Sequence, residues 1–296
     1  MIQPSRSATL RGESEAAAGG LPSLLVEAER LAASIAMGDH GRRRAGVGED
    51  FWQYRQAMPG DTAAAIDWRR SGRSDIAYVR EREWESAHTV AIWSDTAQSM
   101  EYRGNRNLPS KRERANVLAL ALSILLSKTG ERIALPATNA AQPRSGERQI
   151  QRIALALSKP SGPAQEYGSA PNFGDLNAAR SVFLSDFLGP EETVFPPLRA
   201  VTERAGTGCL VHILDETEEH FPFDGRVVFE SMGGGLSYET HRAKGLQAEY
   251  RERFAARCDA LETFARQAGW QYLKHHTSDN PRAALLWLHM AIGGQR

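Results

Sequence analysis

The chain alternates short apolar runs with longer segments in which apolar residues recur at helical spacing. Five short runs indicate strands: "HTVAIWS" from residue 88, "RIALPA" around residue 133, "ARSVFLSD" (179–186), "GCLVHILD" (208–215) and "WQYLKHH" (270–276). Helical patterns lie between and after these runs, over residues 111–128, 147–158, 239–268 and 280–292. Strands that alternate with helices are typical of a parallel sheet covered on both faces. The pattern therefore predicts a doubly wound, mostly parallel α/β domain over residues 88–296.

The sequence before this domain contains three segments of different composition. Residues 1–20 are small, polar and rich in Gly, Ala and Ser, which predicts a disordered tail. Residues 21–36 carry apolar side chains at helical spacing, which predicts an amphipathic helix. Residues 51–85 are dense in charged and aromatic residues around a predicted turn at "MPGD" (58–61). We expect residues 21–87 to form an N-terminal extension, a helix and a charged segment, that packs on the main domain.

Composition restricts the classes of partner. The 296 residues contain 36 Lys and Arg and 36 Asp and Glu, so no net charge favours a nucleic acid. The longest apolar run, residues 117–126, is far shorter than the roughly 20 residues that a membrane-spanning helix requires. Cys209 and Cys258 are isolated and do not suggest a disulfide framework or a zinc site. The sequence therefore predicts a cytoplasmic protein that has no transmembrane segment and binds no nucleic acid.

Three of the predicted strands end in an aspartate: Asp95, Asp186 and Asp215. In a doubly wound sheet, ligands bind outside the carboxyl ends of the strands, where the strand order reverses. Carboxylates gathered there would suit a hard cation such as Mg²⁺, which prefers oxygen ligands. Strand-end aspartates also cap the loops and helices that follow them, by accepting backbone N–H bonds. Both interpretations remain open at this point.

Two loops resemble a known metal site. "DTAQSM" (95–100) resembles the Asp-x-Ser-x-Ser loop of the metal-ion-dependent adhesion site in von Willebrand factor A-type domains, and "FLSDF" (183–187) resembles the later Asp-bearing loop of that site. The resemblance implies Mg²⁺ held by Asp95, Ser99 and Asp186. However, Ala97 replaces the first serine, and Thr138 is only a weak candidate for a third-loop threonine. The sequence therefore predicts a degenerate site whose affinity for Mg²⁺ is weak or lost.

The charged segment carries a second resemblance. "FWQYRQAMPGDTAAAIDWRRSGRSDIAYVRERE" presents an ordered set of residues: Arg55, Pro59, Gly60, Asp61, Asp67, Trp68, Arg73, Arg80 and Glu81. This order resembles the signature of bacterial domain-of-unknown-function family 58, and "HILDETEEHFPFDGRVVFE" (212–230) resembles a later stretch of the same family. Opposite charges are interleaved in the segment, which favours a structural ion-pair network, anchored by burial of Trp68, over a catalytic or phosphate-binding surface.

These resemblances lead to two functional hypotheses. The first is a non-catalytic, von Willebrand factor A-like interaction scaffold, because the family resemblance implies an adaptor or co-chaperone of a MoxR-type AAA+ ATPase. Its partner face would be the sheet edge at Asp95, Ser99 and Asp186. The alternative is a metal-dependent phosphoesterase or nuclease that holds divalent ions with Asp95, Asp186 and Asp215. The alternative requires these three carboxylates to converge, whereas the first hypothesis expects Asp215 to lie farther away.

Overall fold

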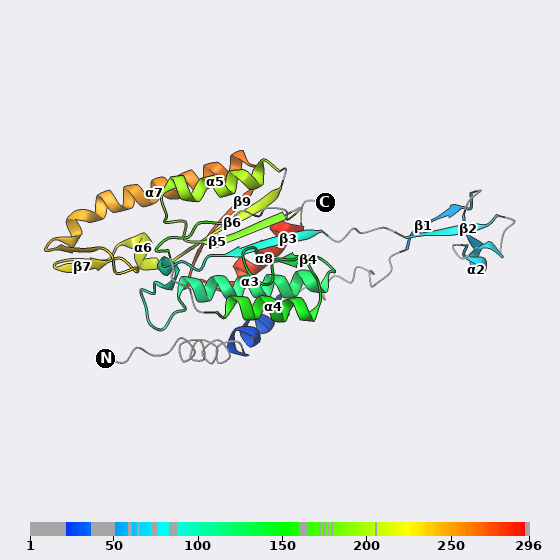
Figure 1. Cartoon of the computed structure of the whole chain (residues 1–296), viewed down its shortest axis with the longest axis horizontal. Helices are drawn as coiled ribbons and strands as arrows, with labels where there is room; N and C mark the ends of the chain where they lie inside the picture. Colours follow the sequence, from blue (N-terminus) through cyan, green and yellow to red (C-terminus); the bar gives the residue numbers. More distant parts are fainter. Residues whose placement is uncertain are drawn as a thin grey trace. The chain divides into compact units, whose positions relative to one another are not determined.

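A computed structural model of the chain describes residues 22–36, 51–58, 61–63, 66–72, 76–82, 88–159, 165–171, 173, 176, 178, 180–204 and 206–293. The chain divides into two compact units, one formed by residues 1–38 and 88–296 and the other by residues 39–87. The predicted tail at residues 1–20 lies outside the described residues. The larger unit carries the predicted α/β architecture (Figure 1).

The larger unit is built on a sheet of five strands: β3 (Thr89–Ser94), β4 (Arg132–Ala134), β5 (Arg180–Ser185), β6 (Thr207–Leu214) and β9 (Gln271–His276). The strands pair in the order β4-β3-β5-β6-β9, and every pairing is parallel. The chain moves from β3 to β4 on one side and then returns to add β5 on the other side of β3. The strand order therefore reverses between β3 and β5, and the loops after these two strands diverge there.

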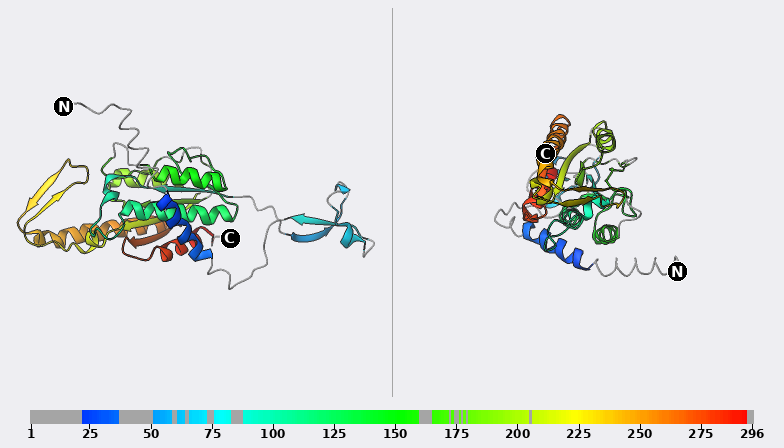
Figure 2. Two further views of the ribbon diagram at one scale, coloured as in Figure 1. Left: turned by 90° about the horizontal axis from the view of Figure 1, so that it is seen from below. Right: turned by 90° about the vertical axis from the view of Figure 1, so that its left-hand side faces the viewer.

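One face of the sheet is covered by α3 (Lys111–Lys128), α4 (Glu147–Leu157) and α8 (Pro281–Gly293). Alternate strand residues such as Val90 and Ile92 point into this layer. Helix α3 is buried around nearly its whole circumference because a further helix, residues 22–36, lies on the same side of the sheet (Figure 2). That helix contributes the i, i+4, i+7 face formed by Ala28, Ala32 and Ile35 to the core.

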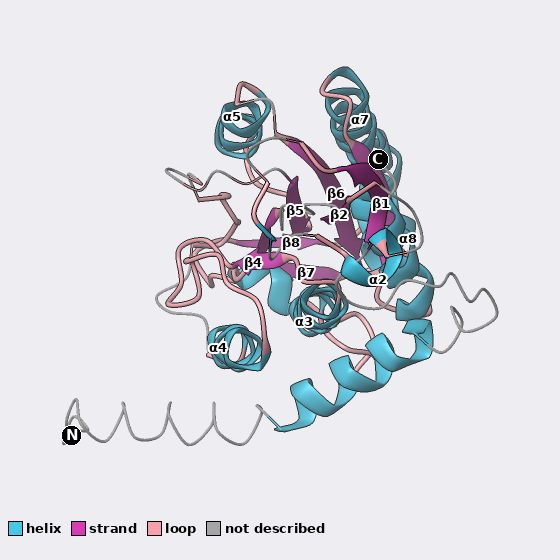
Figure 3. Ribbon diagram, turned by 90° about the vertical axis from the view of Figure 1, so that its right-hand side faces the viewer, coloured by secondary structure: helices cyan, strands magenta, loops and turns pink. Residues whose placement is uncertain are grey.

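The opposite face is covered by α5 (Glu191–Thr202) and α7 (Ala243–Gln267), as the view along the sheet shows (Figure 3). Here the core is aromatic, and Phe183 stacks on Trp270 with 5.5 Å between the ring centroids. Gly208 lies under the indole, where an added Cβ would stand 2.9 Å from the Trp270 ring, so only glycine allows this close packing. Helices on both faces confirm the predicted doubly wound α/β fold.

Shorter elements lie beyond the carboxyl ends of the strands. The 3₁₀ helix η3 (Gln98–Glu101) follows β3, and α6 (Glu216–His220) follows β6. A two-stranded hairpin, β7 (Val227–Glu230) and β8 (Ser237–Thr240), projects on the same side of the sheet as α6 (Figure 1). Phe221, Phe229 and Tyr250 pack together and hold the hairpin to the start of α7.

The smaller unit contains an antiparallel hairpin, β1 (Phe51–Gln56) and β2 (Tyr78–Arg82), and the short helix α2 (Trp68–Ser71). Asp67 caps α2, because its carboxylate accepts hydrogen bonds from the backbone N–H groups of Arg69 and Arg70. The expected packing of this segment on the α/β unit stays a prediction.

Candidate functional site

The loop after β3 is closed around Asp95. Asp95 is 1% exposed, and its Oδ1 accepts a 2.8 Å hydrogen bond from the Ala97 backbone N–H. Its Oδ2 accepts a 2.6 Å bond from the Ser185 hydroxyl, which comes from the end of β5. The carboxylate therefore joins the two loops at the point where the strand order reverses. Sequence reasoning did not identify Ser185 as the partner of Asp95, because the two residues are 90 positions apart.

Asp186, directly after β5, is fully buried and already paired with a cation. The Lys111 ammonium donates to Asp186 Oδ2 over 2.9 Å, and the Leu188 backbone N–H donates to Oδ1 over 3.1 Å. The Ser99 hydroxyl lies near enough to help lower the pKa of Asp186, yet Ser99 Oγ has no hydrogen bond of normal geometry among the described residues. Ser99 is therefore a buried neighbour of Asp186 and not its hydrogen-bond donor.

Lys111 is the residue of this site that sequence reasoning missed. It is the first residue of α3, its side chain is 0% exposed, and its Nζ also contacts Glu218 Oε1 at 2.5 Å. The ammonium stands 5.6 Å from the centroid of the Tyr102 ring. In the sequence, Lys111 is visible only as part of the charged start of a predicted helix. A signal was present, because a lysine is unfavourable at the positive end of a helix unless something else holds it there.

Asp215, after β6, binds backbone and hydroxyl groups of the loops and makes no hydrogen bond with Lys111 in the described residues. Its Oδ1 accepts bonds from the backbone N–H and the hydroxyl of Thr217, and its Oδ2 accepts from the Gly104 N–H over 2.9 Å. A Cβ on Gly104 would stand 2.3 Å from Asp215 Oδ1, so the loop approaches the carboxylate through a glycine. Together with Glu218, Asp215 forms the capping box of α6. Strand β5 separates β6 from β3 in the sheet, and Asp215 binds α6 and the later part of the connection from β3 to α3, at Gly104.

A segment from elsewhere in the chain covers the site. The backbone N–H groups of Gln98 and Ser99 donate to the carbonyls of Gln165 and Glu166, over 3.2 and 2.9 Å. Gly168, in the same segment, lies directly against the Asp95 carboxylate, and an added Cβ would stand only 1.9 Å from Asp95 Oδ2.

The turn of the β7–β8 hairpin reaches the same segment. A Cβ on Gly233 would meet Gln98 Oε1 at 2.9 Å and Glu166 Cβ at 3.7 Å. The loop after β3, residues 165–168 and the hairpin turn are therefore neighbours at the surface, above the buried carboxylates.

The site buries three carboxylates, Asp95, Asp186 and Glu218, but only one ammonium, that of Lys111, among the described residues. Burial and the nearby Asp186 charge raise the pKa of Asp95 to about 6. Burial alone would raise the pKa of Asp186, but the Lys111 ammonium outweighs it and the pKa is lowered. Burial raises the pKa of Glu218, although Lys111 opposes the change. Burial would lower the pKa of Lys111, but the two carboxylates raise it, so the ammonium stays charged. One ammonium thus contacts two of the three buried carboxylates, Asp186 and Glu218, and Asp95 has hydroxyl and backbone donors instead.

The arrangement does not fit Mg²⁺. Both oxygens of Asp95 and both oxygens of Asp186 already accept protein hydrogen bonds, and the free hydroxyl of Ser99 is the single feature that favours an ion. A divalent ion bound to Asp186 would stand beside the Lys111 ammonium and be repelled. Over the described ranges, no three His, Cys, Asp or Glu side chains converge so as to hold a metal. Thr138 serves its own turn, where its hydroxyl donates to the Leu135 carbonyl.

The family-signature residues lie in the smaller unit, where the structure describes some of them. Asp61 accepts a 2.7 Å bond from the Met58 N–H, and Asp67 caps α2, so both stabilise backbone turns. Trp68 is 64% exposed. Arg55 lies in β1, and Arg80 and Glu81 lie in β2. Three predicted residues fall outside the described residues: Pro59, Gly60 and Arg73. The predicted ion-pair network stays a prediction.

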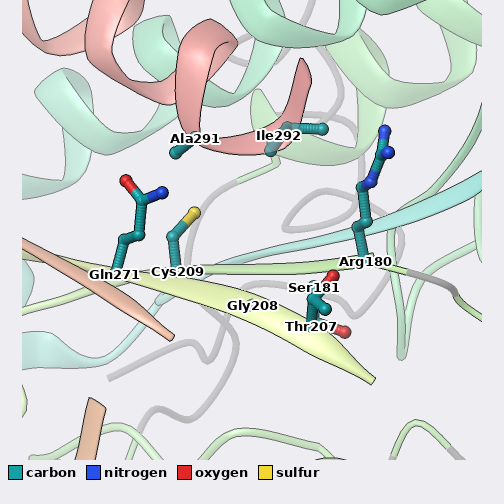
Figure 4. Close-up of a pocket in the computed structure, with 8 residues that line it drawn as sticks. All are labelled: Arg180, Ser181, Thr207, Gly208, Cys209, Gln271, Ala291 and Ile292. Carbon is teal, nitrogen blue, oxygen red and sulfur yellow. The ribbon is translucent and has the colours of Figure 1, made fainter. Parts of the chain in front are cut away.

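A small pocket lies at the amino ends of the strands, opposite the strand-end carboxylates (Figure 4). Arg180, Thr207 and Gln271, the first residues of β5, β6 and β9, line it together with the end of α8. Burial raises the pKa of Cys209 in this pocket to about 12, so its thiol stays protonated and is a poor nucleophile. The pocket is therefore separate from the strand-end carboxylates and lacks an activated group of its own.

Comparison with known proteins assigns the family. Residues 53–262 match the model of the family described as "Protein of unknown function DUF58". The chain belongs to the DUF58 family. The match confirms the family named from the signature residues and covers most of the smaller unit and most of the sheet.

The relatives of this DUF58 protein extend the match. Uncharacterized proteins of Mycobacterium tuberculosis and Mycobacterium bovis are 27% identical to it over 259 residues, covering 83% of this chain and 80% of theirs. The crystal structure of the conserved hypothetical protein BatB from Bacteroides thetaiotaomicron overlaps 70% of this chain and 98% of its own, with 14% identity and a TM-score of 0.45. Among the described residues, no helix combines the length and apolar character needed to cross a lipid bilayer.

Proposed function

We propose that this DUF58 protein is a non-catalytic interaction scaffold with a von Willebrand factor A-like domain, acting in the cytoplasm as an adaptor or co-chaperone of a MoxR-type AAA+ ATPase. The observation that carries the proposal is that protein donors already bind the strand-end carboxylates. Asp95 is bound by Ser185, Asp186 by Lys111, and Asp215 by Thr217 and Gly104. Carboxylates engaged in this way shape loops instead of holding a reactive metal ion.

The partner face that we propose differs from the one predicted from the sequence. Asp95, Ser99 and Asp186 are at most 5% exposed, so a partner cannot touch them directly. The surface above them is formed by residues 165–168 and the hairpin turn. This surface carries exposed apolar side chains, Tyr167 at 40%, Met232 at 44% and Leu236 at 73%. We place the partner face on these three residues.

Co-purification with the candidate ATPase tests the proposal. The DUF58 protein is co-expressed with a MoxR-type ATPase from the same genome and captured in ATP, in ADP and without nucleotide. We expect capture in at least one state, and loss of that capture in Leu236→Glu with little change in melting temperature, because the side chain is exposed.

Met290→Glu provides the matched control. Met290 is 64% exposed and belongs to α8, whose next residues line the pocket at the amino ends of the strands. This variant should retain the ATPase. Absence of capture in every nucleotide state would refute the ATPase partnership, and equal loss in both variants would refute the position of the face.

A further inference from the structure

The strand-end site contains a cation that belongs to the chain itself. Lys111 Nζ lies between carboxylates that follow neighbouring strands, 2.9 Å from Asp186 Oδ2 and 2.5 Å from Glu218 Oε1. Lys111 is fully buried, and Glu218 has a side chain that is 12% exposed. The ammonium thus has two oxygen ligands, an aromatic ring beside it and no access to solvent. A bound metal ion also draws carboxylate oxygens from separate loops, although it requires at least six oxygen ligands.

Full burial of a lysine has to be explained, because an ammonium is strongly hydrated in water. A surface ion pair leaves its charged groups in solvent, and the pair of Arg253 and Glu249, whose side chains are 80% and 63% exposed, is an example. Lys111 instead extends from the start of α3 to the carboxyl ends of β5 and β6. The chain therefore delivers one positive charge to the place where the carboxylates would otherwise repel one another.

The rest of the site is arranged around that charge. Asp186 keeps its second oxygen on the Leu188 N–H, and Glu218 keeps its second oxygen on the Asp215 N–H over 3.0 Å. Each carboxylate thus uses one oxygen for its own loop and the other for Lys111. If the ammonium were removed, two buried oxygens would lose their only positive partner among the described residues.

We infer that Lys111 is a tethered cation that replaces a metal ion, so that the loops after β3, β5 and β6 keep their shape without Mg²⁺. This inference refines the degenerate site on which the proposed function rests, but it does not require the ATPase. It also differs from a simple loss of affinity caused by Ala97. Restoring serine at position 97 should then leave the site unable to bind Mg²⁺, because Lys111 still occupies the position.

Chemical rescue tests the inference. Lys111→Ala removes a propylammonium group, and the melting temperature of the variant is measured with millimolar Mg²⁺, Mn²⁺ or propylammonium. Ionic strength is matched with NaCl, and 1-propanol serves as the neutral analogue of the amine. We expect the variant to melt roughly 10 °C below the native protein, since losing one partner of a buried pair is strongly destabilising. Propylammonium and divalent ions should recover part of this loss, and 1-propanol should not.

Two controls complete the experiment. The native protein and Ala97→Ser should show no melting shift with Mg²⁺ beyond that of matched NaCl. Arg253→Ala, which breaks an exposed pair, should respond to none of the additives. A Mg²⁺-specific shift in the native protein overturns the inference while leaving the scaffold function intact, and so does a Lys111→Ala protein that ignores every cation.

If Lys111→Ala does not fold, a second pair of variants tests the same inference. Lys111→Met keeps most of the volume without the charge, and it is compared with the triple variant Lys111→Met, Asp186→Asn, Glu218→Gln. A counter-charge is no longer needed once the carboxylates are neutral, so the triple variant should fold and melt above Lys111→Met. If the triple variant is no more stable than Lys111→Met, Lys111 acts through packing and the inference is wrong.

Discussion

Asp95→Asn should stabilise the protein at neutral pH, although it changes a buried residue at the centre of the candidate site. Asparagine resembles the protonated aspartate, because its Oδ1 can still accept from the Ala97 N–H and its amide can face Ser185. The substitution therefore removes mainly the cost of the buried charge. The pKa of Asp95 is raised from 3.8 to about 6, and Asp95 is 1% exposed, so solvent screens this cost little. At about 1.36 kcal/mol per pKa unit, the cost is about 3 kcal/mol.

The sign of the pH dependence follows from the raised pKa. The folded protein holds this proton more tightly than the unfolded chain, so the ionised form is penalised in full above about pH 6. The penalty fades as the pH falls from about 6 towards 3.8, where both states are protonated. The advantage of Asp95→Asn should therefore be about 3 kcal/mol at about pH 8 and close to zero at about pH 4.

Urea unfolding of both proteins across this pH range measures the difference. Asp215→Asn is the matched control, because hydrogen bonds from Thr217 and Gly104 outweigh burial and lower the pKa of Asp215. A lowered pKa means that the ionised form stabilises the fold above about pH 3.8 and that this gain is lost only below that pH. Asp215→Asn should therefore be destabilised by a constant amount between about pH 4 and pH 8. A loss of stability in Asp95→Asn at about pH 8 would refute the reasoning.

Two further substitutions test packing. Gly168→Ala would place a Cβ 1.9 Å from Asp95 Oδ2, so we expect a loss of about 1–3 kcal/mol in urea unfolding. Gly235→Ala, with nothing within 4 Å, should change stability by less than about 0.5 kcal/mol, and equal losses would contradict the contact. Trp68→Ala should lower the melting temperature only slightly because Trp68 is 64% exposed, whereas Trp270→Ala, which empties a 5% exposed site, should cost about 3–5 kcal/mol. A loss of that size for Trp68 would show that it is an anchor.

The fold could be predicted from local pattern because its elements are long and apolar. Helix α3 begins at Lys111 and ends at Lys128, as predicted, and the strand over residues 208–215 differs from β6 by one residue at each end. Helix α5 was missed because Pro196 and Pro197 interrupt a pattern that otherwise indicates a helix. Helix α6 was missed because its five residues are too few to show a period.

The site could be predicted only in part, because its decisive contacts join distant positions. The strand-end aspartates were identified from the sequence, since each follows an apolar run. Their partners were not, because Lys111 contacts Asp186 across 75 positions and Glu218 across 107. The proximity of Gly168 to Asp95 depends in the same way on tertiary structure. A local pattern shows which residues end strands but does not show which side chains meet there.

The placement of Lys111 also has a consequence for the order of folding. As the first residue of α3, its ammonium meets the positive end of the helix dipole, although Ser110 and Glu113 form a capping box around the same turn. The ammonium itself is compensated by the distant residues Asp186 and Glu218, and closing such long loops costs entropy before these contacts form. The contacts of Lys111 should therefore form late, after β5 and β6 are in place. Interactions that form after the transition state govern the rate of unfolding more than the rate of folding. Lys111 would thus extend the lifetime of the native protein without hastening its formation.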